Sequence, residues 1–163
     1  MVTSPKVVLI TGCSKGGIGF SLCEEFASQG CKVYATARKL ESMEGFAHEN
    51  IEQLKLDVTS DEDVHEVIST VIEREGRIDV VVNNAGAACM GPLIDISMDD
   101  IRRTYETNTF SIIRMAKAII PYMAARKSGT IVNIGSVVGE TPTPWSGVYA
   151  STKSAWSSSV RAL

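Results

Sequence analysis

The sequence predicts a doubly wound α/β fold, a parallel sheet with helices on both faces, of which about five strands are present. Two observations predict it: short apolar runs alternate with amphipathic segments, and polar residues hardly interrupt those runs. Alternating strands and helices form βαβ units, and continuously apolar strands belong to a sheet covered on both faces. No linker, repeat or low-complexity tract divides the chain, so we expect residues 1–163 to form a single domain.

The first part of the chain is expected to contain three strands, with a helix between the first two. The β-branched run 6–10 ends in a glycine cluster and predicts a buried strand. Apolar residues at helical spacing predict a helix over 18–29, with Gly30 as its C-cap. The apolar run 32–35 and the alternating segment 51–56 predict the second and third strands.

Residues 61–75 carry the clearest helical signals. Ser60 can cap the N-terminus, acidic residues in the first turn complement the helix dipole, and Gly76 ends the pattern. An apolar stripe at helical spacing consists of Val64, Val67, Ile68, Val71 and Ile72. We therefore expect this helix to pack one face against the sheet.

The second part of the chain continues the alternation. The pattern predicts a fourth strand over 78–82, a long helical region over 98–125, a fifth strand over 130–134 and a last helix from about 148 to 163. The doubly wound pattern normally adds a sixth strand. The last helix stops without a capping glycine or a polar tail. We therefore expect a longer fold that is incomplete at the C-terminus.

Composition excludes several classes of function. Lys and Arg number 16 against 19 Asp and Glu, giving a formal charge of −3, and the cations are scattered, so we expect no nucleic-acid partner. No apolar run approaches the roughly 20 residues of a transmembrane helix, and the N-terminus does not resemble a signal peptide. The four cysteines lack CxxC spacing and the two histidines lie 17 positions apart, which favours reduced, mostly buried thiols and no metal site.

A glycine-rich loop lies between the first strand and the first helix, reading Thr-Gly-Cys-Ser-Lys-Gly-Gly-Ile-Gly over 11–19. This context predicts a Rossmann-type dinucleotide site, in which Gly12 makes the tight turn, Gly17 lets backbone approach a pyrophosphate and Gly19 lets helix pack on strand. The other candidate contacts in the loop are Ser14, Lys15 and Ile18. The alternative is a turn that is glycine-rich for geometry alone.

The end of the second strand predicts which nicotinamide cofactor binds. NAD enzymes usually place an acid here for the ribose hydroxyls, whereas NADP enzymes place an arginine near the extra phosphate. This sequence has Arg38 followed by a lysine, with no acid before Glu41. Lys15 of the glycine loop could add a second charge. The pattern favours NADPH/NADP, the alternative being a solvated basic pair.

Further motifs carry a resemblance to a known family. Asn-Asn-Ala-Gly at 83–86, Ser136 and Tyr-Ala-Ser-Thr-Lys at 149–153 follow the Thr-Gly loop in order. Together they resemble the short-chain dehydrogenase/reductase family over the whole chain, and within it the NADPH-dependent 1-acyldihydroxyacetone-phosphate reductases of fungi. Gly16 is one residue more than the family commonly has, which leaves open whether Gly16 or Gly17 contacts phosphate.

The resemblance assigns roles to several residues. It implies that Asp57, Asn84, Ala85 and Gly86 line the adenine side, that Tyr149 and Lys153 also contact the cofactor, and that Asn108 holds a water in a proton relay. For Asn83 we expect mainly a structural role, tying neighbouring strands together.

The residues themselves indicate carbonyl chemistry. Tyr149 and Lys153 share one helix face at i and i+4. An ammonium beside a phenol stabilises the phenolate, so Tyr149 could give its proton to a carbonyl oxygen while hydride arrives from nicotinamide. The hydroxyl of Ser136 could bond the same oxygen. Taken singly, the pair could be an ordinary surface pair and the serine an ordinary cap.

Apolar residues near these motifs suggest the substrate and a partner. Trp145, Met90 and Leu93 favour an apolar carbonyl substrate with a lipid or steroid chain, ordinary loop packing being the alternative. The resemblance implies 1-acyldihydroxyacetone phosphate as such a substrate. Helices 104–125 and 148–163 could form a homodimer interface, as in the resembled family. We expect the protein in the cytoplasm, and the resemblance implies the surface of the endoplasmic reticulum or of lipid droplets as a further location. The alternative function is a non-catalytic dinucleotide-binding or interaction module.

Overall fold

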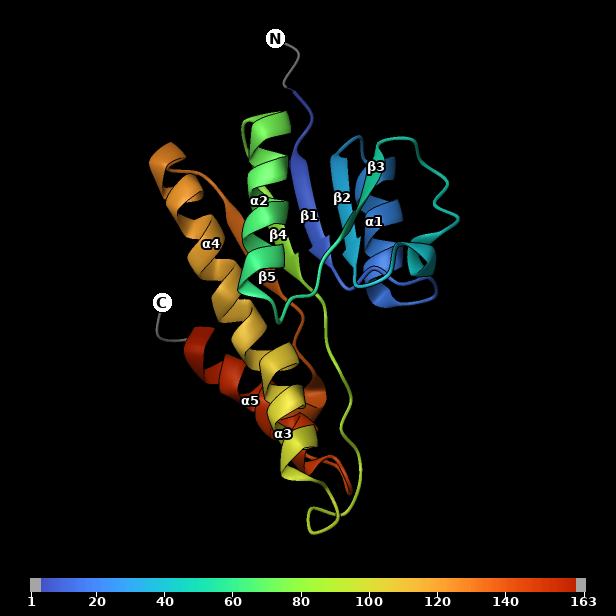
Figure 1. The fold of residues 1–163 in the computed structure, drawn as a ribbon, viewed down its shortest axis with the longest axis vertical. Coiled ribbons are helices and arrows are strands. Elements are labelled where there is room, and N and C mark those ends of the chain that lie inside the picture. Colours follow the sequence, from blue (N-terminus) through green and yellow to red (C-terminus); the bar gives the residue numbers. More distant parts are fainter. Residues whose placement is uncertain (1–3, 161–163) are drawn as a thin grey trace.

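The computed structural model describes residues 4–160, with side chains described up to 156. Five parallel strands form one sheet in the order β3-β2-β1-β4-β5 (Figure 1). The strands are β1 (Val7–Thr11), β2 (Lys32–Ala37), β3 (Ile51–Lys55), β4 (Val80–Asn83) and β5 (Thr130–Asn133). The predicted doubly wound fold is therefore confirmed, with the strand order of a Rossmann sheet.

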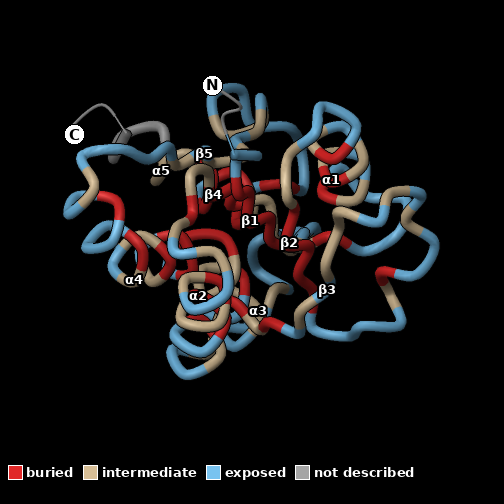
Figure 2. The backbone as a smooth tube through the Cα atoms, turned by 90° about the horizontal axis from the view of Figure 1, so that it is seen from above, coloured by how far each residue is buried: buried red, intermediate tan, exposed pale blue. Residues whose placement is uncertain are grey.

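Two clusters of buried side chains cover the two faces of the sheet. Figure 2 shows that the buried parts of the chain gather around the central strands. Val7 and Leu9 of β1 point to one face, and Val8 and Ile10 point to the other, since side chains alternate along a strand. All five residues of β1 are buried, which explains the continuous apolar run of this central strand.

Residues 4–160 contain five α-helices: α1 (Ile18–Ser28), α2 (Asp61–Glu75), α3 (Met98–Tyr105), α4 (Ser111–Arg126) and α5 (Gly147–Val160). Helices α2 and α4 belong to the core cluster of one face, and α1 belongs to that of the other. Helices α3 and α5 lie together beyond the carboxyl ends of the strands (Figure 1). The last three residues of the predicted helix 148–163 lie outside the described residues.

The helix ends follow the predicted capping signals. The Ser60 hydroxyl accepts a hydrogen bond from the Asp63 N–H at 3.1 Å, and Gly76 ends α2 in the left-handed conformation. After α1, Gly30 also has a positive φ, and its N–H donates to the Ala27 carbonyl at 2.9 Å. These caps are local interactions, which is why the sequence predicts them.

The predicted long helical region over 98–125 is present, but it is not one uninterrupted α-helix. A π-helical turn, η2 (Glu106–Phe110), separates α3 from α4. Its Asn108 is buried and bonds the loop after β4, so long-range contacts stabilise the irregular turn. The sequence also missed two short 3₁₀ segments, η1 (Leu40–Met43) and η3 (Val137–Gly139).

Cys13 and Cys23 are buried with their sulfur atoms 3.4 Å apart, whereas Cys31 and Cys89 are half-buried. All four are free thiols, as the sequence predicts. Among residues 4–160, no helix combines the length and the apolar character that a membrane crossing requires.

Candidate functional site

A cavity of about 940 Å³ opens at the carboxyl ends of the central strands. Parallel strands end at the same edge of a sheet, so the loops that follow β1, β2, β3 and β4 converge there. The lining residues are Gly12, Ser14, Lys15, Gly16, Gly17 and Ile18 of the first loop, Ala37 and Arg38, Leu56 to Thr59, Asn84 to Ala87, and Arg102, Arg103, Glu106 and Thr107.

The cavity brings together most of the predicted cofactor residues. Gly12, Ser14, Lys15, Gly17, Ile18, Arg38, Asp57, Asn84, Ala85 and Gly86 all line it, whereas Gly19, Tyr149 and Lys153 do not. Sequence reasoning missed the wall formed by α3 and η2. This wall consists of Arg102, Arg103, Glu106 and Thr107. They are spaced i, i+1, i+4 and i+5, so they share one helix face, and this spacing could have revealed the wall from the sequence.

Two glycines of the first loop occupy positions that no side chain could share. A Cβ on Gly12, whose φ is +72°, would lie 2.7 Å from the Cα of Ala85. A Cβ on Gly19 would lie 2.5 Å from the Asn84 side-chain nitrogen and 2.6 Å from the Gly12 carbonyl oxygen. Gly19 therefore allows the close packing of helix on strand, while Gly16 and Gly17 both border the cavity.

Hydrogen bonds tie the loop after β1 to the loop after β4. Nδ2 of Asn84 donates to the carbonyl oxygens of Thr11 and Gly12 at 2.8 and 2.9 Å. The Thr11 hydroxyl accepts from the N–H groups of Asn84 and Ala85, both at 3.0 Å. These bonds fix the positions of both loops at the floor of the cavity.

Asn83 has the structural role that the sequence predicts. Its Nδ2 donates to Oδ1 of Asn133 at 2.8 Å, joining β4 to β5.

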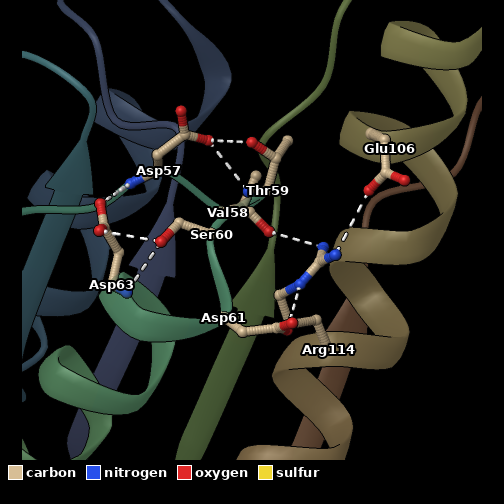
Figure 3. Close-up of polar contacts among 8 residues, drawn as sticks. All are labelled: Asp57, Val58, Thr59, Ser60, Asp61, Asp63, Glu106 and Arg114. Atoms are coloured by element: carbon tan, nitrogen blue, oxygen red, sulfur yellow. Dashed lines mark hydrogen bonds and ion pairs between the residues drawn. The ribbon is translucent and has the colours of Figure 1, made fainter.

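Two cations of the cavity, Lys15 and Arg38, differ from its two acids, Asp57 and Glu106, in whether their side chains have a charged or hydrogen-bonding partner in the described part of the chain. Among the described residues, neither Lys15 nor Arg38 forms an ion pair with a carboxylate. Asp57 instead accepts hydrogen bonds from the N–H and the hydroxyl of Thr59, at 2.9 and 2.7 Å (Figure 3). Glu106 pairs with Arg114 at 3.3 Å (Figure 3). The cations are thus free to meet an anionic ligand, whereas both acids have protein partners.

Lys153 is buried next to this cavity. Its Nζ donates to the Ile134 carbonyl at 2.8 Å and lies 6.0 Å from the centre of the Tyr149 ring. Burial lowers the pKa of the Lys153 ammonium, because removal from water disfavours the charged form. A buried ammonium beside a phenol is the arrangement that the spacing of Tyr149 and Lys153 predicts.

Asn108 joins three segments at the edge of the site. Its Oδ1 accepts from the Ala87 N–H at 2.7 Å, and its Nδ2 donates to the Ala87 carbonyl and the Thr152 hydroxyl at 2.9 and 3.0 Å. A Cβ on Gly86 would lie 3.5 Å from Oδ1 of Asn108 and 3.9 Å from Nζ of Lys153. Gly86 therefore brings the cavity wall against both polar side chains.

Ser136 lies after β5, where its hydroxyl caps η3 by accepting from the Val138 N–H at 3.3 Å. A second hollow of about 430 Å³ lies between the loops after β4 and β5. It is lined by Gly91, Pro92, Leu93, Ile94, Ile96, Thr143, Trp145, Gly147 and Val148. Of the predicted apolar residues, Leu93 and Trp145 line this hollow, whereas Met90 is exposed outside it.

Comparison with known proteins shows which family and which relatives this chain is similar to. The short chain dehydrogenase family matches residues 6–163. Short-chain dehydrogenase cctT of Talaromyces islandicus is 42% identical over 154 residues, covering 92% of this chain and 53% of that protein. The NADPH-dependent 1-acyldihydroxyacetone phosphate reductase of Schizosaccharomyces pombe is 40% identical over 151 residues, covering 92% of this chain and 51% of that protein.

A solved structure agrees with the sequence comparison. The alcohol dehydrogenase of the archaeon Thermococcus sibiricus, in complex with 5-hydroxy-NADP, is 33% identical with a TM-score of 0.88, covering 96% of this chain and 69% of that one. The chain spans about half the length of the curated relatives it matches. The family match extends over nearly the whole chain, and the chain therefore belongs to the short-chain dehydrogenase family.

Proposed function

We propose that these residues form the cofactor-binding and catalytic part of an NADPH-dependent reductase that converts a carbonyl to an alcohol. The observation that carries the proposal is the single cavity that Gly12, Lys15, Arg38, Asp57 and Gly86 share. Its walls come from the carboxyl ends of four parallel strands, where ligands bind in such sheets.

The cavity fits a phosphorylated dinucleotide. Gly16 and Gly17 border the cavity next to the N-terminus of α1, and nothing lies within 4 Å of the missing Cβ of Gly16, so a phosphate could approach this helix end closely. Lys15 and Arg38 can hold the 2′-phosphate, since no carboxylate follows β2 before Glu41. The Schizosaccharomyces pombe relative is named for NADPH, and the Thermococcus sibiricus structure holds an NADP derivative, which supports NADPH as the cofactor of this chain.

Three side chains next to the cavity would carry the proton chemistry. When bound, the cofactor supplies hydride to the carbonyl carbon. The Tyr149 hydroxyl would donate a proton to the carbonyl oxygen, and Ser136 would hold that oxygen by a hydrogen bond. Lys153 favours loss of the tyrosine proton by its charge, and its hydrogen bond to Ile134 orients the ammonium. Asn108 would support a proton relay from the π-helical turn.

An apolar, lipid-like carbonyl compound is the proposed substrate. The hollow beside Trp145 is bordered by apolar side chains that are largely exposed, among them Leu93 at 66% and Ile94 at 94%. Exposed apolar surface of this kind marks ligand or partner sites. The name of the Schizosaccharomyces pombe relative supports 1-acyldihydroxyacetone phosphate, and such a substrate would bring the enzyme to the endoplasmic reticulum or to lipid droplets.

A second candidate function is dinucleotide binding without turnover. The observation that favours it is that most of the predicted cofactor residues line the cavity, whereas Tyr149 and Lys153 do not. Residues 1–163 would then bind NADPH and a protein partner.

The test replaces the proposed proton donor. Tyr149→Phe keeps the ring and removes only the hydroxyl, so it should change NADPH affinity far less than the rate of NADPH oxidation. That rate should fall by about 10²- to 10⁴-fold, the usual contribution of a general acid. Affinity is measured by NADPH fluorescence, and turnover by absorbance with 1-acyldihydroxyacetone phosphate or with a short-chain ketone. Tyr122→Phe, on the exposed side of α4, is the matched control.

Three outcomes separate the alternatives. Turnover that survives Tyr149→Phe contradicts the catalytic assignment. NADPH binding with no carbonyl-dependent oxidation by the unmodified protein supports the binding module instead. Faster turnover of the short-chain ketone than of the lipid contradicts the substrate class while leaving the reductase intact.

A further inference from the structure

Arg114 lies near the start of α4 and binds two segments at once. Its Nε lies 2.6 Å from Oδ1 of Asp61, and its Nη1 donates to the Val58 carbonyl at 3.2 Å (Figure 3). Its Nη2 lies 3.3 Å from Oε2 of Glu106. Only 17% of the arginine side chain is exposed, so these contacts form at the edge of the protein interior.

Two of these partners stand on different walls of the dinucleotide cavity. Val58 belongs to the loop that follows β3, and Glu106 begins the π-helical turn. Both residues line the cavity, whereas Arg114 does not. The Arg114 guanidinium therefore joins the two walls on their side away from the cavity. Its planar set of donors can bond Asp61, Val58 and Glu106 at the same time.

The loop on the Val58 side is itself held in one conformation. The Asp57 N–H donates to Oδ2 of Asp63 at 2.9 Å, while Asp57 accepts from Thr59 (Figure 3). The hydrogen bonds from Asp57 and Ser60 hold the pKa of the Asp63 carboxyl below its usual range. Because these hydrogen bonds hold the loop together, a shift of Val58, which Arg114 bonds, would move Asp57 and Thr59 with it.

We infer that Arg114 is a positioning residue that fixes the width of the cavity between the Asp57–Thr59 wall and the α3–η2 wall, and so sets the affinity for the dinucleotide. Without the guanidinium, the carboxylates of Asp61 and Glu106 would repel each other and the Val58 carbonyl would lose a partner. Both effects separate the walls. The inference rests on the proposed dinucleotide function.

The experiment compares two arginines of the same helix. Arg126 also bonds a backbone carbonyl and a carboxylate, those of Ile78 and Asp79 at 3.3 and 2.8 Å, but it does not line or brace the cavity. Arg114→Gln should weaken NADPH binding about ten-fold, within the range known for residues that act through others. Arg126→Gln should lower the Tm by a similar amount and leave the NADPH affinity unchanged.

Two further variants test the mechanism. Arg114→Lys keeps the charge but loses the planar donor set, so its NADPH affinity should lie between those of the wild type and Arg114→Gln. Adding Glu106→Gln to Arg114→Gln removes the repulsion, and it should increase NADPH affinity more than Glu106→Gln does in the wild-type background.

Hydrogen exchange supplies a readout that needs no cofactor. In the protein without NADPH, Arg114→Gln should speed amide exchange in 57–61 and 106–110, whereas Arg126→Gln should not. Unchanged exchange in both segments overturns the inference, as does equal loss of NADPH affinity in the two variants. If the wild type binds no NADPH at all, the proposed function fails, and the exchange data still decide whether Arg114 braces the walls.

Discussion

At the residue scale, burial of Lys153, a proposed catalytic residue, lowers the stability of the fold. The ammonium is almost fully buried, and the Ile134 carbonyl is its hydrogen-bond acceptor at 2.8 Å. Burial lowers its pKa in the folded chain, whereas the unfolded chain restores the ordinary value of 10.5. Holding this charge therefore costs free energy at neutral pH, a cost that favours a role in chemistry over one in packing.

The pH dependence of stability tests this statement. Between the lowered pKa and 10.5, the unfolded chain binds more protons than the folded chain, so the stabilising free energy rises with pH in that window. We expect the free energy of unfolding of the wild type to rise, relative to Lys153→Met, as the pH is raised from 7 toward 10.5. Urea unfolding of both proteins over this range measures the difference, and parallel pH profiles would contradict the prediction.

The glycines of the first loop also act as single residues. Gly12 and Gly19 are required where backbone from two loops meets, because even a methyl group would lie within 2.7 Å of other atoms. Gly16 differs, since nothing lies within 4 Å of its missing Cβ and only its φ of +80° favours glycine. The extra glycine thus serves the conformation of the loop, while the other two serve its packing.

At the scale of elements, the N-terminus of α2 is hydrogen-bonded to the loop that forms one wall of the cavity. Ser60 caps the helix through Asp63, and the same Asp63 carboxylate accepts from the Asp57 N–H. The start of the helix therefore fixes the loop that carries Asp57.

Removing this cap should have a defined cost. We expect Ser60→Ala to lower the free energy of unfolding by about 1 kcal/mol, the typical value for a lost N-cap. Ser28→Ala is the matched control, because that exposed hydroxyl donates to Glu25 at the end of α1 and caps no N-terminus. Chemical unfolding of the two variants measures both effects, and an equal cost in both would contradict the capping role of Ser60.

At the scale of the whole molecule, α4 exposes an apolar stripe on the side away from the sheet. Phe110 at the end of η2, and Ile113 and Ile120 of α4, are 45 to 48% exposed and share one face at i, i+3 and i+10. Ile112, Met115 and Ile119 of α4 are buried. Burial against the sheet thus accounts for part of the apolar content of this helix. The exposed stripe supports the proposed homodimer through helices 104–125 and 148–163.

A charge on this stripe should separate the two copies. We expect Ile120→Glu to shift the mass in solution from dimer to monomer, because a buried, unpaired carboxylate is costly at an interface. Met98→Glu is the control, because Met98 is an exposed apolar residue at the start of α3 outside the proposed interface, and it should leave the mass unchanged. Light scattering after size exclusion measures the masses, and a monomeric wild type would exclude the homodimer.

Local signals predicted the elements whose causes are local. Ser60, Gly76 and Gly30 cap helices through bonds to residues at most a few positions away, and they act in the structure as the sequence predicts. The apolar strands predicted a sheet covered on both faces, and that sheet then brought the predicted cofactor residues of four loops to one cavity. Sequence alone thus determined the fold class, and it named the residues that the structure brings together at the candidate site.

Only the tertiary structure decided the features that depend on distant partners. The π-helical turn interrupts a segment with continuous helical periodicity, and its Asn108 bonds Ala87 and Thr152, which lie 21 and 44 positions away. Arg114 reaches Val58 across 56 positions. Such contacts leave no periodic pattern in the sequence, because their energy comes from groups that only folding brings together. The sequence determined which residues could bind a dinucleotide, and the folded chain decided which helix face and which arginine shape the cavity.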